Sequence, residues 1–303
     1  MAINHNVHDH QPWCAFPSTY SLLSTTRFLV ASAFIYLSSQ TSTPAQAAWY
    51  NTGGTWLYRK PITIDHTKVS GVASSTLSSF PVLVSVTDTQ LKSTSNGGLV
   101  ASSTGADILF TKSDGTTLLD YEIESYASTT GQLIAWINIP ILSAVTDTTI
   151  YEYFGNASAP AETPGNITGT WDTNYKGVWH MKETLTGANQ LAYDSTSNAV
   201  NATSTGSWTS GQQLAGKVGG SLNFVGSTGI YLHAISAALS VANVTAEAWV
   251  NSTTTSGVCL LDPPIPKTSP WPYELDITST GLADFTIKTV GNVVYSELAQ
   301  QVL

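Results

Sequence analysis

The sequence predicts an all-β protein, with two β-sandwich (jelly-roll-like) domains in tandem after an N-terminal signal segment. Thr, Val, Ile and aromatic residues are abundant, including 13 Tyr and 9 Trp, and these residue types favour strands. Only 10% of the residues are charged, and polarity comes from 36 Ser and 42 Thr instead. Short runs of alternating apolar and polar residues recur between Gly, Asp, Asn and Ser clusters, which is typical of β-sandwiches.

Charge excludes one class of partner. The chain has 11 Lys+Arg and 20 Asp+Glu, which gives a net charge of −9. A nucleic-acid backbone would be repelled by this balance, so we expect no nucleic-acid partner.

Residues 1–47 resemble a secretory signal region. Arg27 is followed by ten apolar residues, 28–37, and then by Ala45-Gln46-Ala47, which has small residues where signal peptidase requires them. Ten residues are too few to span a bilayer, so we expect no integral membrane segment in the mature chain and a secreted or cell-surface location. The alternative is a buried core segment. Because 26 residues precede Arg27, which is long for a signal peptide, a misassigned start is a further hypothesis.

The first domain is predicted over residues 54–155. Its expected strands lie around Ile62, Val84, Ile108, Leu118–Ile123, Leu133–Ile139 and Thr148–Phe154. Ser113-Asp114-Gly115 has tight-turn composition and predicts a hairpin between two of these strands. Six short strands with frequent turns predict two sheets packed face to face.

Six blocks in this domain resemble the DUF2341 family, in family order. They are Trp56–Ile62, Phe80–Val84, Ala106–Phe110, Tyr121–Glu124, Ala135–Pro140 and Ile150–Asn156. The resemblance implies an exported prokaryotic surface protein, a class that includes a biogenesis protein of mannose-sensitive haemagglutinin pili. It implies no established activity.

Glu122 and Glu124 are the acid pair that bears most directly on catalysis. They are two residues apart on a predicted strand, so their side chains share a face. Paired carboxylates can run glycoside hydrolysis. We favour the alternative that they form a solvated rim or pair with Arg59 or Lys60. The sequence shows no Ser-His-Asp, Cys-His or HExxH arrangement.

Residues 156–170 have linker composition and predict a short extended tether. Residues 171–303 then resemble the laminin-G-like, concanavalin A-like lectin superfamily. The resemblance rests on the Trp179 strand, the Asp194–Asn198 loop, the block at Gly220–Phe224 and the strand Ala246–Val250. It implies a jelly roll with carbohydrate, protein or calcium sites on its loops or concave face. About 130 residues are few for such a domain, which predicts that it is incomplete.

Two ligand sites are candidates in the second domain. Asp194 and Asn198 could offer oxygen ligands to calcium, a possible cofactor, although two side chains are few and a plain Asx-turn is the favoured alternative. Carbohydrate could stack on exposed aromatic rings, for which the candidates are Trp208, Tyr231, Trp271 and Tyr273. Trp208 and Trp271 are expected to be exposed, whereas Trp179 and Trp249 are expected in the core.

Hydrolysis is disfavoured in the second domain. Glucanases of the resembled superfamily carry an E-x-D-x-E strand, and here Glu274-Leu275-Asp276-Ile277-Thr278 lacks the third carboxylate. The sequence therefore predicts a non-catalytic surface protein for adhesion or carbohydrate recognition, with glycans or cell-surface proteins as partners. The alternatives are a structural or pilus-associated spacer without a ligand and, third, a polysaccharide hydrolase.

Overall fold

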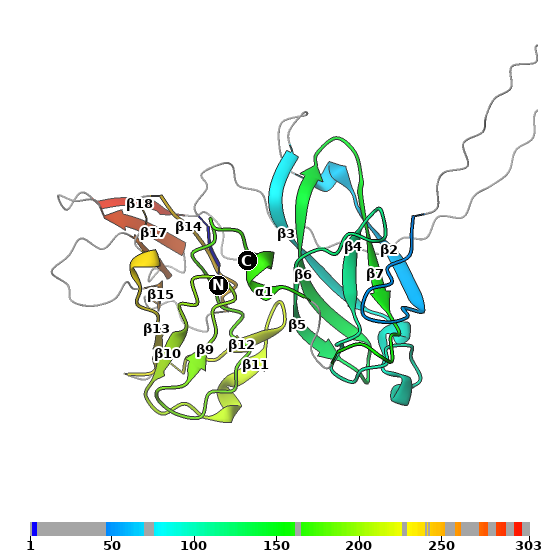
Figure 1. Ribbon diagram of the computed structural model, residues 1–303. Helices are drawn as coiled ribbons and strands as arrows, with labels where there is room; N and C mark the ends of the chain where they lie inside the picture. Colours follow the sequence, from blue (N-terminus) through cyan, green and yellow to red (C-terminus); the bar gives the residue numbers. More distant parts are fainter. Residues whose placement is uncertain are drawn as a thin grey trace, which may run out of the picture.

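The computed structural model describes residues 2–4, 47–69, 76–160, 165–225, 229–239, 241, 243–251 and four later strands (Figure 1). The all-β prediction is confirmed, because these residues form mostly antiparallel strands. The α-helix α1, Ile167–Thr170, is a single turn, and the remaining helical turns are of 3-10 type. Within the described ranges no helix is long and apolar enough to cross a membrane. The predicted signal region lies outside them, except for Ala47 and the strand β1, Ala2–Asn4.

The first unit is a sandwich of two three-stranded antiparallel sheets. One sheet has the order β2-β7-β4, from β2 (Tyr58–Ile64), β7 (Thr148–Phe154) and β4 (Leu109–Lys112). The other has the order β3-β6-β5, from β3 (Thr76–Thr87), β6 (Gln132–Ser143) and β5 (Tyr121–Ala127). Figure 1 shows the two sheets facing each other. The strands follow the predicted apolar alternation closely.

A single core cluster joins the two sheets. Its largest fully buried side chains include Phe110, Tyr121, Leu133, Ile137 and Tyr153, each 0% exposed. Each such side chain contributes about 1.5–3 kcal/mol when it is removed from water, so this cluster is the main source of the unit's stability.

The predicted hairpin at Ser113-Asp114-Gly115 is only half right. The tight turn exists, because Lys112 N donates to Thr117 O at 2.9 Å and Leu119 N donates to Phe110 O at 2.9 Å. The chain then crosses to the opposite sheet, where β5 pairs with β6 and not with β4. Sequence alternation shows where strands lie, but it does not show which sheet each one enters.

Asp107 fixes the point where the chain leaves the first sandwich. Its buried carboxylate accepts backbone N–H groups of Ala101 and Ser102 on one side, at 2.7 and 2.8 Å. On the other side it accepts those of Gly155 and Asn156, at 3.0 and 3.2 Å. A carboxylate that satisfies four backbone donors holds both loops together.

The second half of the predicted linker packs against the first sandwich. Asn166 caps α1, and its side-chain N–H donates to Asp120 Oδ1 at 3.0 Å. Asn138 of β6 donates to Gly169 O at 2.9 Å, and Thr170 is 0% exposed. The expectation of an extended tether is therefore wrong from Asn166 onward, where the chain forms the helical turn α1. In Figure 1, α1 lies between the two bodies of the molecule.

The second unit divides its strands among small antiparallel sheets. Three of these sheets have the strand orders β14-β1-β8, β13-β10-β9 and β11-β12. Besides β1, their strands are β8 (Gly177–Val178), β9 (Leu191–Ala192), β10 (Ala202–Thr205), β11 (Gln213–Ala215), β12 (Gly220–Leu222), β13 (Tyr231–His233) and β14 (Thr245–Glu247). A fourth sheet has the order β15-β16-β17-β18, from β15 (Val258–Leu261), β16 (Tyr273–Ile277), β17 (Ala283–Lys288) and β18 (Val294–Leu298).

Candidate functional site

A buried cluster of ionisable side chains joins the two units. The imidazole of His180 lies between the carboxylates of Glu122 and Glu124, with Nε2 at 3.1 Å from Glu122 Oε2 and Nδ1 at 3.1 Å from Glu124 Oε2. All three side chains are at most 7% exposed. Because a carboxylate only accepts hydrogen bonds, both ring nitrogens must carry a proton to satisfy both partners. The arrangement therefore favours the imidazolium form.

The strand geometry brings the two glutamates to one histidine. Both come from β5 and point away from the sandwich core, toward the segment that follows β8 and carries His180. The pairing of β5 with β6 shifts register between Ile123 and Ser125, which marks a bulge at Glu124. Bulges re-aim side chains, so both carboxylates can reach one ring.

Two tryptophans cover the cluster and bond to it. Trp136 Nε1 donates to Glu124 Oε2 at 2.8 Å, and Trp171 Nε1 donates to Glu122 Oε2 at 3.0 Å. Their ring centroids lie 6.2 and 5.9 Å from that of His180. Trp136 belongs to β6, whereas Trp171 directly follows α1, so the packed end of the linker completes the enclosure.

Two further groups complete the set of hydrogen bonds and charges. Ser195 Oγ donates to Glu122 Oε1 at 2.9 Å. Lys182 Nζ lies 3.7 Å from the same oxygen and donates to the backbone carbonyl of Glu124 at 3.3 Å. Two carboxylates thus face one imidazolium and one ammonium, so the charges balance.

The pKa values reflect this arrangement. Burial pushes the pKa of Glu122 up, but hydrogen bonding and charge from His180 outweigh it and lower that pKa to about 2. The pKa of Glu124 is lowered by the same balance. Burial lowers the pKa of His180, but the two glutamates outweigh it and raise that pKa above its ordinary value. All three groups are therefore held in their charged forms.

The expectation of a solvated acidic rim is wrong for Glu122 and Glu124. Neither of the suggested partners is used, because Arg59 lies over the Trp49 and Tyr151 rings, at 4.5 Å from each centroid, and Lys60 pairs with Asp88. Sequence reasoning missed His180, which is 58 residues from Glu122. Two features of the sequence could have indicated the cluster: two glutamates spaced two residues apart, so that they share one strand face, and a histidine next to a strand that was predicted to be buried.

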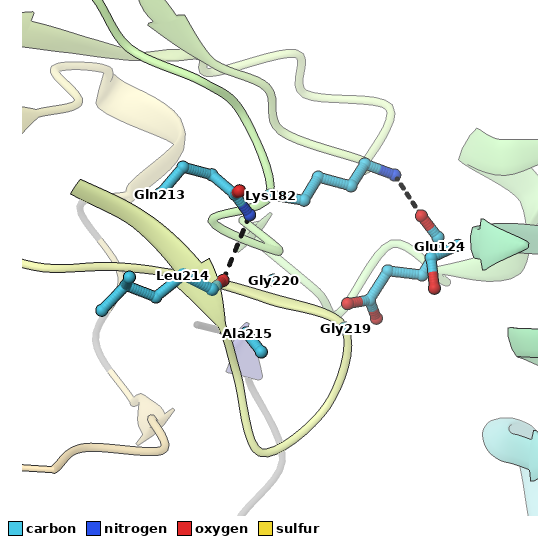
Figure 2. Close-up of a pocket in the computed structure, with 8 residues that line it drawn as sticks. Glu124, Lys182, Gln213, Leu214, Ala215, Gly219 and Gly220 are labelled. Atoms are coloured by element: carbon cyan, nitrogen blue, oxygen red, sulfur yellow. Dashed lines mark hydrogen bonds between the residues drawn. The ribbon is translucent and has the colours of Figure 1, made fainter. Parts of the chain in front are cut away.

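An open cleft lies next to the cluster, where the β11–β12 hairpin meets β5 (Figure 2). It has a volume of about 450 Å³, and its lining comprises Glu124, Ser125, Lys182, Gln213, Leu214, Ala215, Gly219 and Gly220. Gly219 has φ of +53°, and a Cβ there would lie 1.8 Å from Glu124 Oε1. Only glycine permits this approach of the hairpin to β5.

The Asp194 loop has the Asx-turn geometry that we favoured. Asp194 Oδ1 accepts the N–H groups of Val178 and Thr196, both at 2.9 Å. Its Oδ2 accepts the Thr196 hydroxyl and the Val200 N–H, both at 2.9 Å. Asn198 instead donates to the carbonyls of Tyr175 and Lys176, both at 3.2 Å. Calcium binding by Asp194 and Asn198 stays a prediction.

Replacing Asp194 with asparagine is expected to lower the free energy of unfolding by about 2 kcal/mol. The new amide N–H₂ would face two hydrogen-bond donors at the buried position of Oδ2. Urea unfolding followed by Trp fluorescence measures the change. The control is Asn198→Ala, an exposed side chain that bonds two carbonyls, and an equal loss in both variants would contradict the role given to Asp194.

The structure gives mixed results for the aromatic carbohydrate candidates. Trp208 is 3% exposed and its Nε1 donates to Thr205 O, so its predicted exposure is wrong. The cause is Phe224, whose ring packs edge-on against Trp208 with centroids 5.1 Å apart. Tyr231 is 49% exposed and remains a candidate. Trp271 and the side chain of Tyr273 lie outside the described residues.

Of the two tryptophans that were predicted to lie in the core, one is buried and the other is exposed. Trp179 is buried as predicted, and its Nε1 donates to Val200 O at 3.0 Å. Trp249 is 56% exposed, so its predicted core position is wrong. Lys217 Nζ lies 5.7 Å from the Trp249 ring centroid, which places a cation over an exposed aromatic face.

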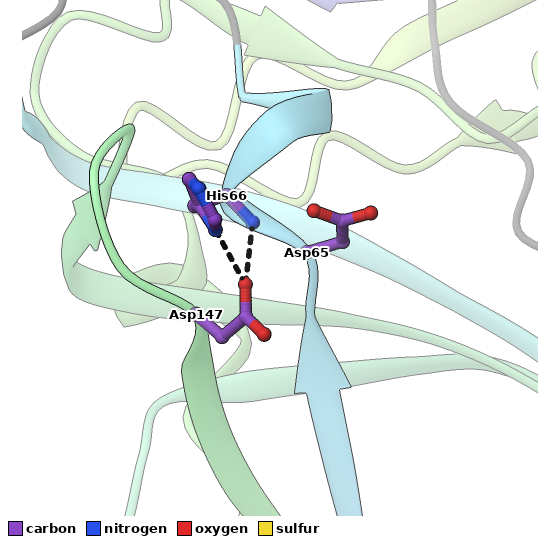
Figure 3. A group of neighbouring side chains, drawn as sticks. All are labelled: Asp65, His66 and Asp147. Carbon is purple, nitrogen blue, oxygen red and sulfur yellow. Dashed lines mark hydrogen bonds and ion pairs between the residues drawn. The ribbon is translucent and has the colours of Figure 1, made fainter. Parts of the chain in front are cut away.

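Asp65, His66 and Asp147 form a separate group near the surface of the first sandwich, with ligand-type atoms within 4.8 Å of one another (Figure 3). Both aspartates already have protein partners. Asp65 Oδ1 accepts the N–H and hydroxyl of Thr67, and Asp147 Oδ1 accepts the N–H of His66 and lies 2.7 Å from its Nδ1. These contacts hold the β6–β7 turn against the end of β2, and nothing else at the group points to a metal ion.

Comparison with known proteins supports part of the predicted resemblance. Residues 104–210 match the family model described as "Domain of unknown function (DUF2341)". The match begins later than the predicted domain and runs across the junction to include Glu122, Trp136, Trp171, His180 and Ser195. No curated protein matches the chain.

One solved structure is similar over part of the chain. It is an S-layer domain-containing protein (residues 221–444) from Clostridium thermocellum, with 18% sequence identity and a TM-score of 0.34. The alignment covers 42% of this chain and 58% of that one. The laminin-G-like resemblance of residues 171–303 stays a prediction.

Proposed function

We propose that this chain is a secreted or cell-surface, non-catalytic structural protein whose two β units are held in a fixed relation. The observation that carries the proposal is the burial of Glu122, Glu124 and His180 between the units. Hydrolysis by paired carboxylates needs one protonated acid and access for substrate and water. Here both carboxylates are held ionised beneath two tryptophans, which supports a structural role instead.

The junction has the features of a rigid joint. Side chains from β5, β6 and the segments around Trp171, His180 and Ser195 bond to one another. Beside them, Val178 and Val218 pack against Trp136 and Trp171. Buried charges with several fixed partners tolerate little displacement, because each lost partner leaves a charge unpaired.

A distance measurement tests the fixed relation. Spin labels at Thr63→Cys and Thr209→Cys, exposed positions on the two units, should give one narrow distance distribution when the native cysteines are replaced by serine. A matched pair within the first sandwich, Thr63→Cys and Lys112→Cys, gives the width expected inside a single unit. A much broader distribution across the junction would contradict the proposal.

Carbohydrate recognition is the second candidate function. The open cleft beside Lys182 and Gln213 supports it, and so do the exposed rings of Tyr231 and Trp249. Hydroxyl groups of a sugar could bond to the cleft's polar groups, and a pyranose ring could stack on an exposed aromatic ring. The partners would then be glycans or glycosylated cell-surface proteins.

A glycan array with the full chain distinguishes the functions, run with calcium and again with a chelator. The structural proposal expects neither binding nor release of reducing sugar. Binding that is reduced by Tyr231→Ala or Trp249→Ala would establish recognition, and loss on chelation would make it calcium-dependent. Release of reducing sugar would show an enzyme and overturn both proposals.

A further inference from the structure

Lys60, Asp88 and Glu152 form a second group of charged side chains at the boundary of the first sandwich's core, where Glu152 is buried and the Lys60 and Asp88 side chains are 31% and 33% exposed. Lys60 of β2 lies directly opposite Glu152 of β7 in the strand register, so both side chains project on the same face of their sheet. This face is the core side of the sheet. Ile150 and Phe154, two residues before and two residues after Glu152, project on the same face and belong to the buried core. Asp88 follows β3 in the opposite sheet and forms an ion pair with Lys60.

Asp88 is held in place for this contact. Its Oδ1 accepts the N–H of Gln90 at 2.9 Å, and its backbone N–H donates to Gly131 O at 3.0 Å. The other carboxylate oxygen, Oδ2, faces Lys60 Nζ. The Phe154 ring centroid lies 5.8 Å from the same nitrogen. The amine and the carboxyl are therefore fixed against each other beside an apolar surface.

Glu152 is unusual among the carboxylates of the described residues. It is 3% exposed, and its Oε1 has no hydrogen-bond partner in the described structure. Burial raises its pKa to about 7, and the charges of Lys60 and Asp88 then act on it in opposite directions. Burying a carboxylate oxygen without a hydrogen-bond partner is unfavourable, which favours the protonated form. Near neutral pH it can both take up and release a proton.

We propose that Lys60 Nζ and Asp88 Cγ become joined by an amide bond, with Glu152 as the proton carrier. Glu152 takes one proton from the Lys60 ammonium, and the freed amine attacks Asp88 Cγ to form the C–N bond. A second proton passes from nitrogen to one carboxyl oxygen, Glu152 returns its proton to the same oxygen, and the C–O bond breaks as water leaves. Ammonium and carboxylate are thereby converted into a neutral amide and one water molecule, without any cofactor.

The surroundings favour this condensation. Fixed proximity replaces a bimolecular encounter, and effective concentrations of well-oriented groups far exceed those in solution. The Lys60 and Asp88 side chains are 31% and 33% exposed, and the Phe154 ring centroid lies 5.8 Å from Lys60 Nζ, so part of the surrounding water is excluded and a neutral product is favoured. The bond would tie β2 of one sheet to the end of β3 in the other and would close the chain between residues 60 and 88. It would be a crosslink that does not depend on cysteine.

Intact-mass spectrometry of the denatured full chain tests the proposal. Once its N-terminus is established, the wild-type chain should be lighter than its sequence by the mass of one water molecule. Lys60→Arg and Glu152→Gln should each have the full mass of their own sequence. Two controls should keep the deficit. They are Lys112→Arg, an exposed lysine of β4, and Glu183→Gln, which replaces a glutamate that also has an unpartnered oxygen but lies away from Lys60 and Asp88.

A variant and a digest locate the bond. Asp88→Asn should lose the mass of one ammonia molecule instead of water, because the leaving group is then the side-chain amide nitrogen. Cleavage after Arg59, Lys68 and Lys92 should release residues 60–68 and 69–92 as one branched peptide. A wild-type chain of full sequence mass would overturn the proposal, and so would a deficit that survives Lys60→Arg.

Discussion

Replacing His180 with alanine is expected to lower the free energy of unfolding by about 3–5 kcal/mol. The substitution removes the imidazolium that faces both Glu122 and Glu124, and it leaves two buried carboxylates with Lys182 as their remaining cation. An uncompensated buried charge is far more unfavourable than the loss of an average hydrogen bond. Urea unfolding at pH 6, followed by Trp fluorescence, measures the change.

The matched control is His233→Ala. His233 is an exposed histidine of β13 whose ring lies 3.3 Å from the Thr205 hydroxyl, so its loss should change stability by less than about 1 kcal/mol. A His180→Ala protein as stable as the His233→Ala protein would show that the cluster does not hold the units together. A triple variant, His180→Ala with Glu122→Gln and Glu124→Gln, should recover part of the loss, because it removes the unpaired charges.

Stability is expected to fall in acid by about 3 kcal/mol through Glu122 alone. The pKa of this glutamate is about 2 in the folded protein and 4.5 as its ordinary value. A lowered acid pKa contributes stability that is fully present above pH 4.5 and is lost as the pH falls through about 2. His180 acts in the opposite direction. Because its pKa is raised, its contribution is complete below pH 6.5 and is lost as the pH rises through the folded-state pKa.

The cluster should therefore be most stabilising between about pH 4.5 and 6.5. Urea midpoints measured from pH 2 to pH 9 should show a maximum in this range. The acid decline should flatten in Glu122→Gln and remain in Asp120→Asn, which keeps the oxygen that accepts from Asn166. A wild-type acid decline that Glu122→Gln leaves unchanged would assign the acid sensitivity to other carboxylates.

The strands of the first sandwich could be predicted because their signal is local. Alternation at Ile62, Val84 and Ile150 places one face of each strand in the core, and the sheets follow it. The crossing after Leu119 could not be predicted, since the turn at Asp114 is the same whether the next strand pairs with its neighbour or enters the other sheet.

The site was harder to predict because its parts are far apart in the chain. Glu122 and Glu124 were recognised as a pair on one face, but their partner comes from beyond the predicted linker. The solvent exposure of two tryptophans, Trp208 and Trp249, was predicted wrongly for a related reason. The flanks of Trp208 are polar and those of Trp249 are apolar, yet exposure depends on non-local packing such as that of Phe224 against Trp208.

The pairing of β2 with β7 also determines how the first sandwich responds to force. Tyr58, where β2 begins, is paired with Phe154, where β7 ends, so the chain enters β2 and leaves β7 at the same end of this strand pair. Tension along the chain would load the hydrogen bonds between the two strands one after another, starting at this end, and not all together as in shear. Lys60 lies two residues from this end of the pair. An amide at Lys60 would stop such unzipping almost where it begins and pass the load to the opposite sheet through Asp88.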